Sequence, residues 1–164
     1  MTPVDPATRI GHVHLKVSDL ERAIAFYSGV LGFELTQYYS AGQAAFLSAG
    51  DYHHHIGLNT WESLGATPPP KGHTGLFHTA FLYPDRAALA DALRRVVEAE
   101  IAIEGAADHG VSEAIYISDP DRNGVELYVD KPMHEWPRDA SGNLAMVNEP
   151  LDLERLLAEA PARG

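Results

Sequence analysis

The chain has 164 residues, of which 45% are hydrophobic and 21% charged, and its formal net charge at pH 7 is -11. This length and composition predict one globular domain, residues 1–164, with a hydrophobic core. The negative charge argues against nucleic acid as a partner, and no apolar run is long enough to cross a membrane. Because the chain has no cysteine, disulfides and thiolate metal sites are excluded, and we expect a cytoplasmic protein.

The first half of the chain predicts a strand, a helix and three further strands. Residues 9–17 alternate apolar and polar side chains, which is typical of a half-buried strand. Ser18 and Glu21 form a capping box at the start of the expected helix, and Gly32 suits its end. Further strands are expected over residues 33–39, 43–49 and 53–60, between turns that contain glycine.

The second half repeats this order after a linker, residues 61–71, that contains three consecutive prolines. The pattern predicts a strand over 76–83, a helix through about residue 100, and strands over 101–106, 113–118 and 125–130. We therefore expect an α+β protein made of two βαβββ modules, about residues 9–61 and 73–130. The modules would form a cupped mixed sheet with helices on its outer face. An irregular tail with a short helix, residues 131–164, follows.

Two histidines and a glutamate fall at corresponding places in the two modules. His12 opens the first strand of the first module, His78 lies in the first strand of the second, and Glu126 lies in the last strand. A single strand histidine is usually just hydrogen-bonded, so the prediction depends on this equivalent placement. Two imidazoles and a carboxylate form the facial triad that suits Fe(II), and Mn(II) is possible. Three protein ligands leave positions open for substrate and oxygen.

The sequence resembles the vicinal oxygen chelate superfamily over about residues 10–130. The resemblance is carried by Gly11-His12-Val13-His14-Leu15-Lys16-Val17-Ser18-Asp19-Leu20, by Ala25-Phe26-Tyr27 with Val30-Leu31-Gly32-Phe33, and by Asp119-Pro120-Asp121-Arg122-Asn123-Gly124-Val125-Glu126. In that superfamily two βαβββ modules form a cup around a metal ion, and the positions that match its ligands are His12, His78 and Glu126. Residues 52–61 and 123–128 are similar to the catechol 2,3-dioxygenase branch.

Resemblance to this branch implies three catalytic residues, His54, His109 and Tyr116. Tyr116 would hydrogen-bond a catechol hydroxyl or accept its proton. His54 would stabilise the charge that develops on oxygen and then donate a proton, which suits the proton affinity of histidine. His109 would hydrogen-bond the substrate or the ring-opened product. His55 is a rival for the role of His54, because three histidines are consecutive here.

The implied function is that of an Fe(II)-dependent extradiol dioxygenase, which opens a small aromatic diol with O2. One alternative is another metal enzyme of the superfamily, a glyoxalase-type lyase or a thiol transferase. Glyoxalase-type sites use a carboxylate in the fourth strand as a further metal ligand. Residues 56–59 contain no carboxylate, which argues against a glyoxalase-type site. A second alternative is a metal-free binding or resistance protein. Such a protein does not need metal ligands, so the presence of histidine or glutamate at all three ligand positions weighs against it. Members of the branch are often longer, because they contain a second pair of modules. In this chain a second subunit would supply the part of the substrate-binding wall that the second pair forms, so we expect a homodimer.

Overall fold

A computed structural model of the chain describes residues 2–39 and 41–162. They divide into two compact units, Met1–Pro69 and Pro70–Gly164, and the boundary falls in the proline-rich linker. Each unit contains one βαβββ module, which confirms the α+β class and the predicted order of elements. In the described ranges, no helix has the length and hydrophobicity that a bilayer span requires.

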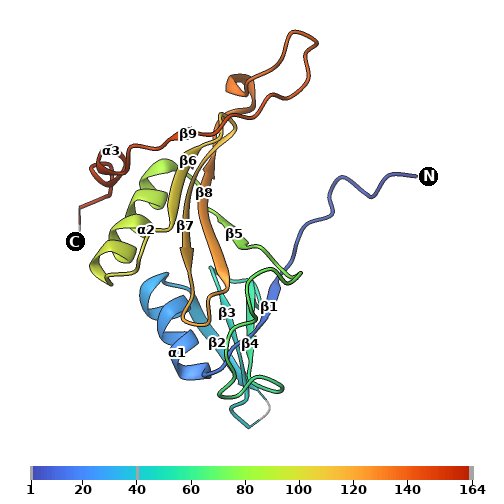
Figure 1. Cartoon of the computed structure of the whole chain (residues 1–164), viewed down its shortest axis with the longest axis vertical. Coiled ribbons are helices and arrows are strands. Elements are labelled where there is room, and N and C mark those ends of the chain that lie inside the picture. Colours follow the sequence, from blue (N-terminus) through green and yellow to red (C-terminus); the bar gives the residue numbers. More distant parts are fainter. Residues whose placement is uncertain (1, 40, 163–164) are drawn as a thin grey trace. The chain divides into compact units, whose positions relative to one another are not determined.

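The first unit is a four-stranded mixed sheet with a helical segment (Figure 1). Its strand order is β1-β4-β3-β2, in which β1 and β4 are parallel and the other neighbours are antiparallel. The elements are β1 (Val13–Lys16), α1 (Leu20–Ile24), the π-helical turn η1 (Ala25–Val30), β2 (Glu34–Tyr39), β3 (Ala44–Ser48) and β4 (Ile56–Asn59). Fully buried Tyr27, Leu47, Ile56 and Leu58 are at the centre of its core.

Two local predictions for this unit are wrong. Asp19 caps α1 in place of Ser18, because its carboxylate accepts the Arg22 N–H at 3.0 Å, whereas the Ser18 hydroxyl accepts from the Arg22 guanidinium at 2.7 Å. His53, His54 and His55 lie in a bend before β4. The alternation of a strand therefore does not set the directions of their side chains.

The second unit is a five-stranded mixed sheet of order β5-β8-β7-β6-β9, with helix α2 beside it (Figure 1). Only β5 and β8 are parallel among its neighbouring strands. The elements are β5 (Thr79–Leu82), α2 (Arg86–Glu98), β6 (Gly105–Asp108), β7 (Ser112–Ser118), β8 (Gly124–Asp130), the 3-10 turn η2 (Met133–Glu135), β9 (Glu149–Pro150) and α3 (Leu153–Leu157). Leu89, Leu93 and Val96 form the buried side of α2.

The boundaries of several elements differ from the predicted ones. His78 immediately precedes β5, and β6 begins at Gly105, four residues later than predicted. Val97 of α2, although apolar, is 48% exposed. The short helix of the tail is confirmed as α3, which packs against α2 and buries Leu156 completely. Strand β9 was not predicted, because two residues are too few to show a period.

Candidate active site

Strands β7 and β8 place Tyr116 and Glu126 next to each other on one face of the second sheet. The two residues are directly paired in the antiparallel register. Their chain neighbours Ile115, Ile117 and Leu127 are buried on the opposite face. The alternation of the strands therefore directs Tyr116 and Glu126 to the half-exposed face, away from the apolar core.

His78 contacts the same carboxylate from the residue before β5. Because β5 runs parallel to β8 with Ala80 opposite Glu126, a residue two positions before Ala80 lies on the same face. The His78 Nε2 is 2.8 Å from Glu126 Oε2, and the His78 Nδ1 is buried without a hydrogen-bond partner. The pair therefore offers imidazole nitrogen and carboxylate oxygen together, and this donor set fits a divalent metal ion.

Gly124 permits the close approach of the segment that carries His78. A Cβ atom at position 124 would lie 2.2 Å from the Phe77 carbonyl oxygen and 3.2 Å from the His78 Cβ. Neither distance is tolerated without movement, and the nearer atom belongs to the backbone. The glycine of the turn therefore allows His78 and Glu126 to meet.

We expect Gly124→Ala to destabilise the chain by about 1–3 kcal/mol, because the added methyl group displaces the backbone at Phe77. The same displacement moves His78 and should weaken metal binding. Urea unfolding and metal titration measure the two effects. Gly29→Ala is the matched control, since its added Cβ meets nothing within 4 Å. Unchanged unfolding and metal binding in Gly124→Ala would contradict the close approach.

Tyr116 links this pair to His109, which lies between β6 and β7. The Tyr116 hydroxyl is 2.7 Å from His109 Nε2 and 3.3 Å from Glu126 Oε1. Burial, together with the charge and hydrogen bonding of Glu126, raises the pKa of Tyr116 to about 12. The hydroxyl is therefore protonated at neutral pH. His78, Glu126, Tyr116 and His109 form one connected set within the second unit.

His12 and His54 lie side by side in the first unit, with ring centroids 4.6 Å apart. The His54 ring also packs 4.7 Å from that of Phe46, and its Nδ1 is 2.7 Å from the Nδ1 of His53. Burial lowers the pKa of His54, and the neighbouring histidines, His12 first, lower it further. The structure thus places the predicted acid-base residue next to a predicted metal ligand.

His55 has a different environment from His54. Its Nδ1 accepts a hydrogen bond from the Ala49 N–H at 3.3 Å and lies 3.0 Å from the Ser48 hydroxyl oxygen. These contacts tie His55 to the end of β3 and the turn that follows it. The His54 ring contacts that of His12, whereas the His55 ring packs against that of Tyr52.

The six predicted site residues therefore fall into two groups, His12 with His54 in the first unit, and His78, Glu126, Tyr116 and His109 in the second. Among the residues that the structure describes, no three histidine or acidic side chains form a cluster that could hold a metal ion. His78 and Glu126 are two of the three predicted ligands. His12 stays a prediction as the third.

A groove of about 450 Å³ lies beside His78 and Tyr116 in the second unit. Binding sites for small molecules typically start at roughly 300 Å³, so a single aromatic ring fits this volume. Phe77 and Arg122 also line the groove, and neither was predicted as a site residue. Arg122 has a φ of 63°, which is rare outside glycine, and it lies in the turn between β7 and β8.

Comparison with known proteins assigns the chain to a family. The model of the Glyoxalase/Bleomycin resistance protein/Dioxygenase superfamily matches residues 9–127. The chain belongs to this superfamily, and the resemblance seen in the sequence is confirmed.

The chain is also similar to two dioxygenases. It is 42% identical over 160 residues to the catechol-2,3-dioxygenase of Bacillus subtilis (strain 168), an alignment that covers 98% of this chain and 55% of that protein. It is 30% identical over 122 residues to biphenyl-2,3-diol 1,2-dioxygenase 3 of Rhodococcus globerulus, covering 74% of this chain and 63% of that protein. The chain thus spans about half the length of the first relative and less than two thirds of the second.

The fold itself is found in solved structures. The crystal structure of a glyoxalase/dioxygenase from Nostoc punctiforme matches with a TM-score of 0.65 and 22% identity, over 80% of this chain and 99% of that one. At this level of identity the match establishes the fold alone.

Proposed function

We propose that the chain is an Fe(II)-dependent extradiol dioxygenase that opens a catechol-like ring with O2. The observation that carries the proposal is the connected set of His78, Glu126, Tyr116 and His109, of which His78 and Tyr116 line a groove large enough for one aromatic ring. Similarity to two enzymes named for aromatic diols supports the same substrate class.

The proposed metal ligands are His12, His78 and Glu126. A bound Fe(II), or Mn(II) with the same ligands, would hold the two diol oxygens and O2 together and let electrons pass between them. His54 is proposed as the acid-base residue because its ring contacts that of His12. A histidine beside a ligand is well placed to donate a proton to oxygen during ring cleavage.

Tyr116 and His109 are proposed to remove a proton from the diol. The Tyr116 hydroxyl is already protonated at neutral pH, since its pKa is about 12. It can accept a proton from the diol only if it passes its own proton on. His109 Nε2, 2.7 Å from the hydroxyl oxygen, is positioned to accept that proton. The diol oxygen then gains the negative charge that favours binding to a cation.

The test is anaerobic reconstitution with Fe(II), addition of catechol, and then O2. We expect a yellow ring-opened product, formed in step with oxygen consumption. A 1,3-diol of the same ring is the control substrate, since its oxygens are not adjacent, and a chelator-treated sample is the control protein. Stoichiometric Fe(II) binding without a product from a panel of substituted catechols would contradict the proposal.

The proposed assembly is a homodimer, as expected from the sequence. Light scattering during size-exclusion chromatography measures its mass. A mass of 17.8 kDa at working concentrations, that of one chain, would contradict it.

A further inference from the structure

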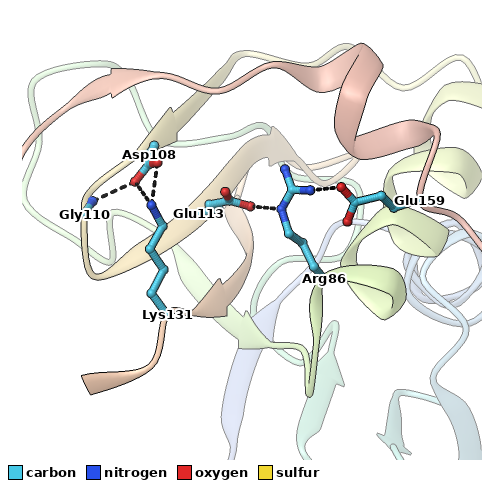
Figure 2. Close-up of polar contacts among 6 residues, drawn as sticks. All are labelled: Arg86, Asp108, Gly110, Glu113, Lys131 and Glu159. Atoms are coloured by element: carbon cyan, nitrogen blue, oxygen red, sulfur yellow. Dashed lines mark hydrogen bonds and ion pairs between the residues drawn. The ribbon is translucent and has the colours of Figure 1, made fainter. Parts of the chain in front are cut away.

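The C-terminal segment of the second unit, residues 147–159, is held in place by several contacts along its length. Strand β9 pairs with β6 through Asp108↔Glu149, and α3 packs against α2. Arg86, the first residue of α2, connects the segment to the sheet, because its guanidinium pairs with Glu159 and, at 2.6 Å, with Glu113 of β7 (Figure 2). The segment is therefore packed against the sheet and α2 of this unit.

The turn that carries His109 is also held on both sides. The Asp108 carboxylate accepts the Gly110 N–H at 2.8 Å and pairs with Lys131 Nζ at 2.6 Å (Figure 2). Burial acts to raise the pKa of Asp108, but the hydrogen bonds from Lys131 and Gly110 outweigh it and lower that pKa. The carboxylate is therefore charged at neutral pH, and the backbone on each side of His109 is restrained.

Val147 meets this turn and forms two hydrogen bonds with His109. The Val147 N–H donates to the His109 carbonyl oxygen at 3.0 Å, and His109 Nδ1 is 3.2 Å from the Val147 carbonyl oxygen. A carbonyl oxygen can only accept, so this contact requires a proton on Nδ1. In neutral His109 the lone pair is then on Nε2, the nitrogen 2.7 Å from the Tyr116 hydroxyl.

We propose that the C-terminal segment positions Tyr116 and His109 for proton transfer, because the Val147 carbonyl fixes His109 in the Nδ1–H tautomer. Val147 is a positioning residue, since it acts through His109 and through its backbone. With this tautomer, the Tyr116 hydroxyl, which donates to Glu126 Oε1 at 3.3 Å, can turn its proton toward the lone pair of His109 Nε2 at 2.7 Å. With the other tautomer, Nε2–H would occupy that position and block the transfer. The part that this transfer plays in catalysis rests on the proposed ring-cleavage function.

A side-chain substitution at Val147 leaves its carbonyl in place, so the variant must displace the segment. Gly110 offers this possibility. A Cβ at position 110 would lie 2.7 Å from Pro137 Cγ and 3.2 Å from Val147 Cγ2. Gly110→Ala should therefore move the segment away from His109. Gly142→Ala is a matched control, because Gly142 has a similar positive φ, 82° against 77°, yet its added Cβ meets nothing within 4 Å.

The test is NMR of the full chain labelled with 15N-histidine, both as purified and with added diamagnetic Zn(II). A His109→Gln variant assigns the His109 signals. We expect neutral His109 to be the Nδ1–H tautomer in the unsubstituted chain and in Gly142→Ala. In Gly110→Ala we expect a mixture with Nε2–H, and a kcat for ring cleavage lower by roughly 10- to 100-fold, as for loss of an orienting partner.

An Nε2–H tautomer in the unsubstituted chain would overturn the proposal, whatever the activity and whether or not Gly110→Ala folds. A pure Nδ1–H tautomer in folded Gly110→Ala would also contradict it. An Nδ1–H tautomer in a chain that cleaves no catechol would support the assignment to Val147 and would contradict the ring-cleavage function instead. The two proposals therefore fail separately.

Discussion

His78→Ala is expected to abolish specific metal binding and, with it, ring cleavage. The substitution removes one of two donors held 2.8 Å apart and leaves the Glu126 carboxylate without that partner. The loss of metal affinity should exceed the roughly 10- to 100-fold that follows loss of an outer-shell partner, because a proposed ligand itself is removed. Elemental analysis after dialysis and isothermal titration measure metal content and affinity. Glu126→Gln, which keeps the size and removes the charge, should act in the same direction.

The control for this prediction is His73→Ala. His73 is an exposed histidine of the same unit, and its ring contacts the Pro70 carbonyl oxygen. Its loss should leave metal content unchanged, which separates a specific site from general binding by a chain with nine histidines. Metal that stays stoichiometric when His78→Ala and Glu126→Ala are combined would rule out the site.

His54→Ala is expected to lower kcat by about 10²- to 10⁴-fold while the metal content stays at the unsubstituted level. The proposed proton donor is lost, whereas the proposed ligands His12, His78 and Glu126 remain. Steady-state kinetics of the Fe(II)-loaded chain, with metal content measured on the same sample, separates turnover from metal binding.

His55→Ala is the matched variant, because it removes the adjacent histidine. Its expected effect is on stability, about 0.5–1.5 kcal/mol, since the contacts of Nδ1 with Ala49 and Ser48 are lost. Turnover of the folded variant should stay within a few-fold of the unsubstituted chain. If His55→Ala loses turnover and His54→Ala keeps it, the acid-base role belongs to His55.

Local sequence patterns predicted most of the fold correctly. The repeated βαβββ order, the glycine that ends the first helical segment and the short helix of the tail were all predicted, because each produces a period or a cap within a few residues. The prediction of the cap of α1 failed because a competing local group was present. Both Ser18 and Asp19 can cap a helix, and only the observed bond of Asp19 to Arg22 shows which one does.

The candidate site residues were predicted for a different reason, and they stay predictions. Resemblance to the superfamily identified Tyr116 and His109, and the structure joins them to Glu126 and His78. The resemblance could not identify Val147. This residue contacts His109, 38 positions away in sequence, through its backbone carbonyl, a group that every residue has. Nor could the sequence decide between His54 and His55 for the acid-base role, because both lie outside a strand and no alternation sets the directions of their side chains.

The sequence by itself determined the class of fold, the metal-ligand candidates and the kind of chemistry they suit, because these depend on residue types and on periods along the chain. Only the tertiary structure decided which of these groups meet. His78 and Glu126 are 48 positions apart, and they meet because β5 lies parallel to β8 and Gly124 lets the chain come close. Strand pairing and close packing are long-range events, and neither is encoded in the spacing of residues along one segment.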